Sequence, residues 1–263
     1  MPEGHTVHRT AAQFKKSFQG QKIQVTSPQG RFGDAGLISN TKLLQAEAWG
    51  KQLFLHFEPA ILRIHLGIYG KWGWSSFEDS PKEPVGQVRA RFVASNQLAD
   101  LRGPTACELL LPGAVEQVTA KLGPDPLRPD PKGVQKQRFI ERVLRSRVAI
   151  GQLLMDQGVL AGVGNVYRAE LLFRAGLSPF TPGEKVPIEL VERLWEDAVA
   201  LMQIGVKKGI MLTRDGFLKG MPKKADRYYV YKREGQSCRE CGGEISIALM
   251  ATRKLYWCPR CQP

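Results

Sequence analysis

Cys238-Arg-Glu-Cys241 and Cys258-Pro-Arg-Cys261 are two Cys-x-x-Cys pairs separated by sixteen residues of the 263-residue chain. Four thiolates at this spacing can surround one Zn²⁺ tetrahedrally, whereas the alternative, a redox dithiol, needs only one pair. Gly242-Gly243 permits a tight turn after the first pair, and the residues between the pairs alternate as in a hairpin. The stretch therefore predicts a β-hairpin zinc finger with one closed, structural zinc site at Cys238, Cys241, Cys258 and Cys261.

The predicted finger lies in the most basic part of the chain. Residues 206–263 carry 13 Lys and Arg against 5 Asp and Glu, which is +8 of the formal net charge of +13. Such an excess indicates a polyanionic partner, either nucleic acid or an acidic membrane surface. No run approaches the ~18 apolar residues of a membrane span, and no basic helix has a broad apolar face. Nucleic acid is therefore favoured, with no membrane partner.

Cysteine usage and the start of the chain bear on location. The first residues contain no apolar signal core, and closely spaced cysteine pairs in a reducing compartment favour metal over disulfides. A cytoplasmic protein associated with the nucleoid is expected. Cys107 lies in an apolar run and is expected to be a buried spectator.

Arg253 and Lys254 stand at the expected tip of the hairpin between the two cysteine pairs. A rigid hairpin that offers two cations can clamp phosphates, and a solvated surface pair is the alternative. Upstream, the loop Gly158 to Asn165 holds three glycines ahead of a helix. Asn165 is expected to cap that helix and, with nearby N–H groups, could hold a phosphate; a plain connecting turn is equally compatible.

The remaining chain divides by its hydrophobic pattern. Residues 4–19 predict a helix whose apolar stripe anchors the chain start. Short alternating apolar runs from Lys22 to Leu111 predict a β-sandwich or barrel-like domain. These runs are 23–25, 43–44, 53–57, 61–66, 88–93 and 108–111.

Beyond the strands, Pro112 to Gly133 is rich in proline and predicts an extended linker. Residues 137–207 predict helices, and the glycine-rich segment 209–237 predicts a mobile loop or hairpin. The expected domains are 1–120, 121–220 and 221–263.

The first three residues carry the sharpest chemical hypothesis. If Met1 is removed, Pro2 has a secondary amine that titrates near ~7.7–8.0 and can form an iminium with an electrophilic carbon. Glu3 places a carboxylate beside it. Alone, this start is common among proteins. Lys51 follows Trp49-Gly50 at a strand entrance, where lysine is usually solvated.

Together and in this order, these motifs resemble the formamidopyrimidine-DNA glycosylase/endonuclease VIII family of DNA repair enzymes over nearly the whole chain. The resemblance implies an α+β protein of two lobes. The N-terminal lobe is a β-sandwich with a leading helix, and the C-terminal lobe has a helix–two-turns–helix motif and a β-hairpin zinc finger. Damaged double-stranded DNA would bind in the cleft between the lobes. A monomer without a redox or nucleotide cofactor is expected.

The resemblance also implies catalytic roles. Pro2 would attack the sugar C1′ of a flipped-out nucleotide and displace the base, and successive β- and δ-eliminations would cut the strand. Glu3 would be the general acid/base, and Lys51 would supply a proton or positive charge near the sugar and phosphate. Arg253 would assist the second elimination.

Further roles concern DNA binding. Asn165 and Arg253 would hold the phosphates that flank the lesion, and Ile68 and Tyr69 match the loop that fills the hole left by the flipped base. Glu170, in the helix after Asn165, would be structural or supporting.

The branch of the family is indicated by two loops. The start Pro2-Glu-Gly-His5 is nearer endonuclease VIII, and Leu101–Cys107 lacks the Phe of the formamidopyrimidine branch. Gly67, however, stands where endonuclease VIII proteins usually have Gln. Removal of oxidised pyrimidines is therefore favoured. The alternatives are an oxidised-purine glycosylase and a non-catalytic protein that binds damaged DNA.

Overall fold

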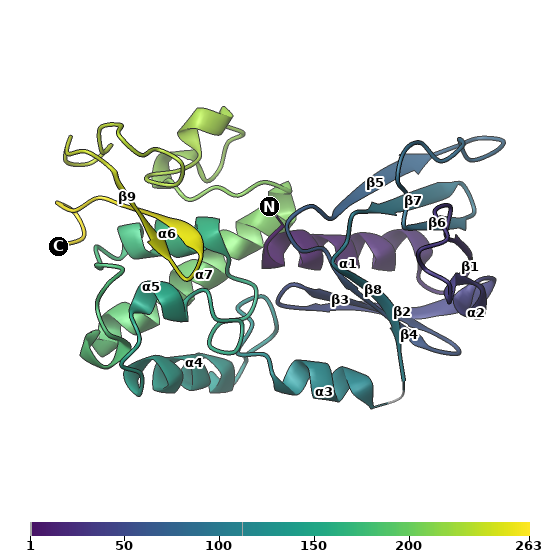
Figure 1. Ribbon diagram of the computed structural model, residues 1–263, viewed down its shortest axis with the longest axis horizontal. Helices are drawn as coiled ribbons and strands as arrows, with labels where there is room; N and C mark the ends of the chain where they lie inside the picture. Colours follow the sequence, from purple (N-terminus) through teal and green to yellow (C-terminus); the bar gives the residue numbers. More distant parts are fainter. Residues whose placement is uncertain (1, 112) are drawn as a thin grey trace. The chain divides into compact units, whose positions relative to one another are not determined.

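The computed structural model describes residues 2–111 and 113–263 and divides into two compact units between Ala120 and Lys121 (Figure 1). Each unit has its own hydrophobic core. The predicted division into 1–120, 121–220 and 221–263 stays a prediction. No helix within the described residues is long and apolar enough to cross a membrane.

The first unit is built on eight strands in the order β5-β7-β6-β1-β2-β3-β4-β8, and every pairing is antiparallel. The strands are β1 (Lys22–Thr26), β2 (Thr41–Trp49), β3 (Gln52–Phe57), β4 (Ile61–His65), β5 (Lys71–Ser76), β6 (Ala90–Ala94), β7 (Gln97–Arg102) and β8 (Ala106–Leu110). The strand β1 pairs with β2 through its first two residues and with β6 through its last three. It therefore joins a group of three strands (β5, β7 and β6) to a group of four (β2, β3, β4 and β8), as the predicted sandwich requires.

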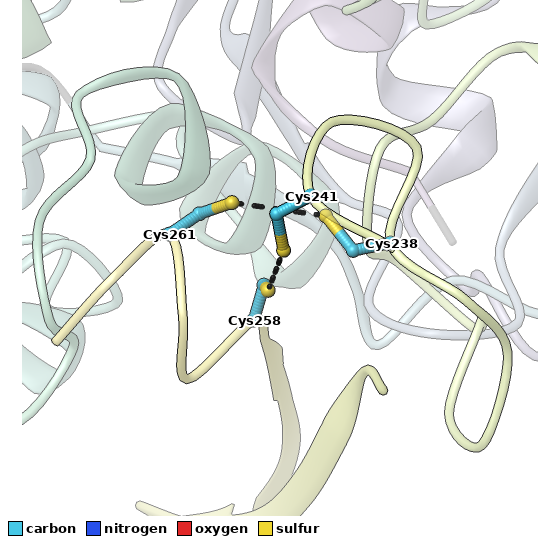
Figure 2. Close-up of side chains that lie close together, drawn as sticks. All are labelled: Cys238, Cys241, Cys258 and Cys261. Carbon is cyan, nitrogen blue, oxygen red and sulfur yellow. Dashed lines mark hydrogen bonds between the residues drawn. The ribbon is translucent and has the colours of Figure 1, made fainter. Parts of the chain in front are cut away.

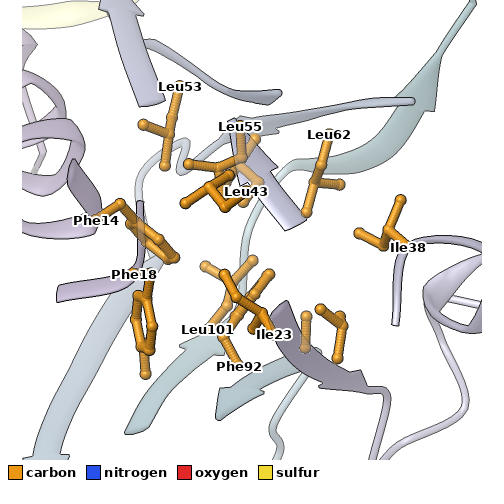
Figure 3. Close-up of a cluster of buried hydrophobic side chains, with 14 of the residues drawn as sticks. Phe14, Phe18, Ile23, Ile38, Leu43, Leu53, Leu55, Leu62, Phe92 and Leu101 are labelled. Atoms are coloured by element: carbon orange, nitrogen blue, oxygen red, sulfur yellow. The ribbon is translucent and has the colours of Figure 1, made fainter. Parts of the chain in front are cut away.

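Helix α1 (Gly4–Phe18) packs against β2 and β3 with the stripe expected from the sequence. Val7, Ala11, Phe14 and Phe18 are all buried. Figure 3 shows the two phenylalanine rings pointing into the cluster of strand residues that includes Leu43 and Phe92. Because this face is fixed in the core, the residues just before α1 are held in place. A second short helix, α2 (Ala35–Ile38), was not predicted.

Two strands, β5 and β7, were missed because polar or small residues interrupt their pattern. Asp100 lies in the middle of β7 and is only 4% exposed, where it accepts hydrogen bonds of 2.7 and 2.9 Å from the Arg91 guanidinium. A buried, paired carboxylate breaks the apolar alternation that predicts a strand. In β5, Gly73 separates Trp72 and Trp74, whose rings both contact Phe14.

The predicted extended linker at 112–133 is wrong for most of its length, and its first residue, Pro112, lies outside the described residues. Helix α3 (Ala114–Ala120) forms within it, because this stretch contains neither glycine nor proline. The following segment packs onto the second unit: Gly123 N–H donates to the Gln157 carbonyl at 2.8 Å, and Asp125 is buried.

The second unit begins with helices around a core that includes Phe139, Leu171 and Trp195. The helices are α4 (Val134–Leu144), α5 (Ile150–Leu153), α6 (Asn165–Arg174) and α7 (Ile188–Lys208), with a 3₁₀ turn η1 (Gly183–Lys185). Helix α6 is buried along its length from Asn165 to Phe173, so its polar residues need partners inside the protein.

The finger hairpin consists of β9 (Ser246–Met250) and β10 (Arg253–Trp257), and its turn is Ala251-Thr252. The position predicted for Arg253 at the hairpin tip is confirmed, since it is the first residue after this turn. In the segment 209–237 the structure has two 3₁₀ turns, η2 (Asp215–Phe217) and η3 (Lys224–Asp226), and no hairpin.

Candidate functional site

Pro2 and Glu3 directly precede helix α1 and differ in how deeply they are buried. Pro2 is half-buried, whereas Glu3 is 0% exposed. The Glu3 backbone is extended, and its carbonyl accepts the first helical bond from the Thr6 N–H at 2.9 Å. A buried carboxylate therefore lies next to the proline in the sequence. Removal of Met1 concerns a residue outside the described ones.

His5 was not singled out from the sequence, yet it is buried two residues after Glu3. Burial, with the charges of Arg9 and His8, lowers the pKa of His5 to about 4. The imidazole is therefore neutral at pH 7, and its Nε2 lies 3.2 Å from the Thr6 hydroxyl. Nothing in the local sequence pattern distinguishes it from the other histidines, because only the packing of α1 buries it.

Lys51 is half-buried in the turn between β2 and β3, where Gly50 has a φ of +57°. The next residue, Gln52, pairs with His65 across β3 and β4. Lys51 is close enough to His65 that its charge, after burial and Arg63, lowers the pKa of this histidine. Lys51 therefore lies beside the start of the loop that follows β4.

Ile68 and Tyr69 occupy that loop, between β4 and β5. Their side chains are 43% and 84% exposed, respectively. The turn that carries them is closed by a 2.9 Å hydrogen bond from the Gly70 N–H to the Leu66 carbonyl. Pro2, Glu3 and Lys51 belong to the same unit as this loop.

Asn165 belongs to the second unit and makes a different contact from the one predicted. It is the first residue of α6, and Gly164 occupies the N-cap position, so the capping role is wrong. Its side-chain amide instead donates to the Lys254 carbonyl at 2.9 Å. The fully buried Arg168 donates to the same carbonyl at 3.1 Å and to the Asn165 side-chain oxygen.

These contacts join helix α6 to the finger beside Arg253, which is half-buried at the start of β10. Arg253 also lines a hollow of about 460 Å³ together with Gln152, Met155 and Asp156. Arg253 thus borders a hollow that both polar and apolar residues line. Arg168 could not be assigned from the sequence, because an arginine in a helix gives no sign of which distant carbonyl it contacts.

Glu170, five residues after Asn165 and two after Arg168 on α6, makes a separate hydrogen-bond network. Its carboxylate accepts four hydrogen bonds, from the Thr213 hydroxyl (2.6 Å) and from three consecutive N–H groups. These groups belong to Tyr229, Val230 and Tyr231. Burial raises the pKa of Glu170, and the four bonds oppose that shift because they favour the carboxylate. The structural or supporting role suggested for Glu170 stays a prediction. The carboxylate bonds both ends of segment 213–229, Thr213 and Tyr229, and in this sense is a clip that holds the two ends together.

The four cysteines of the finger come together as Figure 2 shows. Sγ atoms of Cys238 and Cys261 lie 3.8 Å apart, those of Cys241 and Cys258 3.5 Å apart, and all four lie within 4.8 Å of one another. A disulfide would need about 2.05 Å. Tetrahedral ligands at a metal–sulfur distance of about 2.3 Å are separated by about 3.8 Å. The cluster therefore fits one metal ion.

The thiols of the cluster differ in their pKa values. The Gly243 N–H lies 3.4 Å from Cys241 Sγ and is the main cause that lowers the pKa of this thiol to about 7, whereas burial raises the pKa of Cys258 and of Cys261. Cys107 lies outside the cluster, half-buried in β8, where burial raises its pKa to about 12. The expected full burial of Cys107 is wrong, and its raised pKa disfavours the reactive thiolate.

Two family models match the chain. The formamidopyrimidine-DNA glycosylase N-terminal domain matches residues 1–107, and the formamidopyrimidine-DNA glycosylase H2TH domain matches residues 122–215.

Whole-chain relatives carry two names. Endonuclease 8 1 of Mycobacterium tuberculosis is 45% identical and Endonuclease 8 of Escherichia coli is 30% identical, each over all of both chains. A formamidopyrimidine-DNA glycosylase of Parasynechococcus marenigrum is 28% identical over all of this chain and 99% of its own.

Solved structures agree with the fold. The MutM (Fpg) protein of Thermus thermophilus superimposes with a TM-score of 0.79 at 28% identity, covering 99% of this chain and 98% of its own. Lactococcus lactis Fpg, crystallised with DNA that contains an abasic site, has the same fold, with a TM-score of 0.80 at 23% identity over 99% of each chain. The chain belongs to the formamidopyrimidine-DNA glycosylase/endonuclease VIII family, the DNA glycosylases of base excision repair.

Proposed function

We propose that this chain is a bifunctional DNA glycosylase and AP lyase that removes oxidised pyrimidines and cuts the strand by β,δ-elimination. The observation that carries the proposal is the start of the first unit. There the fully buried carboxylate of Glu3 follows a half-buried Pro2 and is held by the core packing of α1. A nucleophile fixed beside an acid/base is the arrangement that covalent catalysis needs.

The chemistry requires Pro2 as a secondary amine, hence removal of Met1. The Pro2 nitrogen attacks C1′ of the flipped nucleotide, the glycosidic bond breaks, and the base leaves with a proton. Glu3 protonates the sugar ring oxygen, and C1′ becomes an iminium with the Pro2 nitrogen. Loss of a C2′ proton expels the 3′ phosphate, and a further elimination, assisted by Arg253, expels the 5′ phosphate. Lys51 supplies positive charge near the sugar and phosphate.

The second unit would hold the flanking phosphates of damaged double-stranded DNA. Arg253 offers its guanidinium from the finger strand β10, and the Asn165 amide is bonded to the Lys254 carbonyl of the same strand. The formal net charge of +13 supports a polyanionic partner. The protein would act on chromosomal DNA in the cytoplasm, as a monomer and without a redox or nucleotide cofactor.

Zinc is the metal we assign to the four-cysteine cluster. Four thiolates leave no open coordination position, which suits a structural Zn²⁺. The ion would cross-link the two ends of the β9–β10 hairpin and would take no part in the reaction. Cys238 and Cys258 are buried against Tyr229 and Tyr256 in the small core of the finger, so the metal would stabilise this core.

Oxidised pyrimidines are favoured over oxidised purines because the relative at 45% identity is an endonuclease 8 protein. The 45% identity to Endonuclease 8 1 exceeds the 28% to a formamidopyrimidine-DNA glycosylase. Duplexes that contain thymine glycol, dihydrouracil or 8-oxoguanine, compared under single turnover, decide between the two. Faster release of 8-oxoguanine would reverse the assignment.

The test of the mechanism is borohydride trapping on abasic-site duplex DNA, followed by mass spectrometry. The expected result is a covalent adduct at Pro2, absent in a Pro2→Gly variant. Full nicking by Pro2→Gly would contradict the nucleophile assignment. No adduct from zinc-loaded protein shown to lack Met1 would favour the alternative, a protein that binds damaged DNA without cutting it.

A further inference from the structure

Two loops of the first unit lie side by side. The probe loop, Leu66–Gly70, joins β4 to β5, and the seat loop, Gly103–Thr105, joins β7 to β8. The last residue of β4 pairs with the first of β8, and the first of β5 pairs with the last of β7. Because these pairs bracket both loops, the sheet pairing places the seat loop against the probe loop.

The contact between the loops is tight at Gly67. This residue has a φ of +64°, and a Cβ placed on it would lie 1.8 Å from the Thr105 hydroxyl oxygen. The Thr105 N–H donates to the His65 carbonyl at 2.8 Å, which fixes the Thr105 backbone and hence its Cβ, itself only 3.0 Å from the position of a Cβ on Gly67. Position 67 therefore accepts only glycine as long as Thr105 occupies this place.

A second contact lies under the exposed aromatic residue. Gly103, with a φ of +58°, packs beneath the Tyr69 carbonyl, which is 3.5 Å from the position of a Cβ on Gly103. Gly70 closes the other side, since its Cβ would meet the Leu66 carbonyl oxygen at 2.2 Å. Leu66 itself is buried in the core. The backbone of the probe loop is thus confined from both sides, while the Tyr69 side chain stays 84% exposed.

We propose that the seat loop holds the probe loop in one preformed conformation, so that Tyr69 stacks in the DNA beside the flipped nucleotide without an ordering cost. The backbone at position 105, anchored by its N–H bond to the His65 carbonyl, positions the seat loop, and the Thr105 side chain occupies the space beside Gly67. The proposal rests on the proposed function, which supplies DNA as the partner. Stacking of a base on an exposed aromatic ring is favourable for any base, and a preorganised loop loses little entropy on binding.

The seat loop has a second consequence for reading the opposite strand. Gly103, Pro104 and Thr105 carry no aromatic or cationic side chain, and they lie against the probe loop. Filling of the space in the duplex therefore depends on Tyr69 and its neighbour Ile68. Because stacking on a ring is tolerant of base identity, excision should depend weakly on the base opposite the lesion.

The chain offers a matched pair of glycines for the test. Gly67→Ala and Gly103→Ala impose a similar left-handed backbone strain, but only the first meets Thr105. The double variant Gly67→Ala/Thr105→Gly removes the collision and keeps the strain. The readout is 2-aminopurine fluorescence in a duplex placed beside a tetrahydrofuran abasic analogue, which reports stacking without any reaction. Nicking of abasic sites in duplex and in single-stranded DNA is measured in parallel.

Tyr69→Ala should lose the fluorescence change and nick duplex sites roughly tenfold more slowly than the unmodified protein, with a smaller loss of nicking on single-stranded sites. Gly67→Ala should resemble Tyr69→Ala, and the double variant should recover to the level of Gly103→Ala. Equal behaviour of the two single alanine variants, or no recovery in the double variant, would overturn the proposal. Failure of the proposed function would give a different result. The unmodified protein would then form no borohydride adduct, whereas the fluorescence of the variants would still show whether the seat loop positions Tyr69.

Discussion

The side-chain amide of Asn165 donates a 2.9 Å hydrogen bond to the carbonyl oxygen of Lys254, 89 residues later in the chain. The buried Arg168 donates to the same carbonyl, so two side chains of helix α6 bind the finger strand at the residue next to Arg253. The proposed phosphate contacts at Asn165 and Arg253 are therefore parts of one assembly. A change at Asn165 acts on DNA through the finger as well as through its own amide.

Asn165→Ala should weaken binding to duplex DNA roughly tenfold for all sequences, because the Lys254 carbonyl and the buried Arg168 guanidinium each lose a partner. The slope of affinity against salt should stay unchanged, since asparagine has no charge. Arg253→Ala, in contrast, should reduce that slope by about one. Fluorescence anisotropy across a salt series measures both. Asn96→Ala, in an exposed turn of the first unit, is the control, and an equal loss there would make the effect unspecific.

Glu170→Gln should destabilise the second unit by roughly 2–3 kcal/mol. A glutamine keeps one acceptor oxygen, which can serve Val230 and Tyr231, and turns its amide towards Thr213 and the Tyr229 N–H. That N–H then has no acceptor in a buried place. Urea unfolding gives the free energy. Glu78→Gln, at an exposed position, should change it by less than about 0.5 kcal/mol. A similar free energy of unfolding for both variants would show that the Glu170 hydrogen bonds do not stabilise the second unit.

Metal removal tests the finger. Native mass spectrometry should find one zinc per chain, and Cys258→Ser should lose it, because a structural site needs all four thiolates. The variant should also melt at a lower temperature, since Cys258 is 0% exposed in the finger core. Cys107→Ser should keep its zinc. A full zinc content in Cys258→Ser would remove this cysteine from the ligand set.

Stability should fall with acid through His5. Its pKa is about 4 in the folded protein and 6.5 when unfolded, so the unfolded chain binds a proton first as the pH drops. The stabilisation is fully present above pH 6.5, is lost progressively between pH 6.5 and 4, and amounts to roughly 3 kcal/mol over that window.

A His5→Gln variant isolates this contribution. Thermal unfolding at about pH 7.5 and at about pH 5 should show a smaller acid-induced loss for the variant than for the unmodified protein. His65, whose pKa is also lowered, contributes in the same direction to both proteins. Parallel losses in the two proteins would mean that His5 is not buried as a neutral group.

Several sequence predictions held because they depend on local pattern. The stripe of α1 and the strands at 53–57 and 61–66 are correct, since period and alternation report directly on which face is buried. The linker prediction failed at α3, because the proline content was judged over all of 112–133 although Ala114–Ala120 contains no proline. Predictions also failed where a buried ion pair replaced apolar residues, as at Asp100 in β7. The capping role of Asn165 failed because a distant carbonyl took its amide.

The sequence by itself determined the family, the four-cysteine cluster and the chemical types at the proposed catalytic positions. These depend on residue identity and on short spacings along the chain. Only the tertiary structure decided that Asn165 meets Lys254, that Glu170 binds three successive amides, and that Thr105 confines Gly67. Such contacts join residues far apart in the chain, and their partners are set by the path of the strands and helices between them. A local pattern records burial, but it carries no information about which distant group shares the buried space.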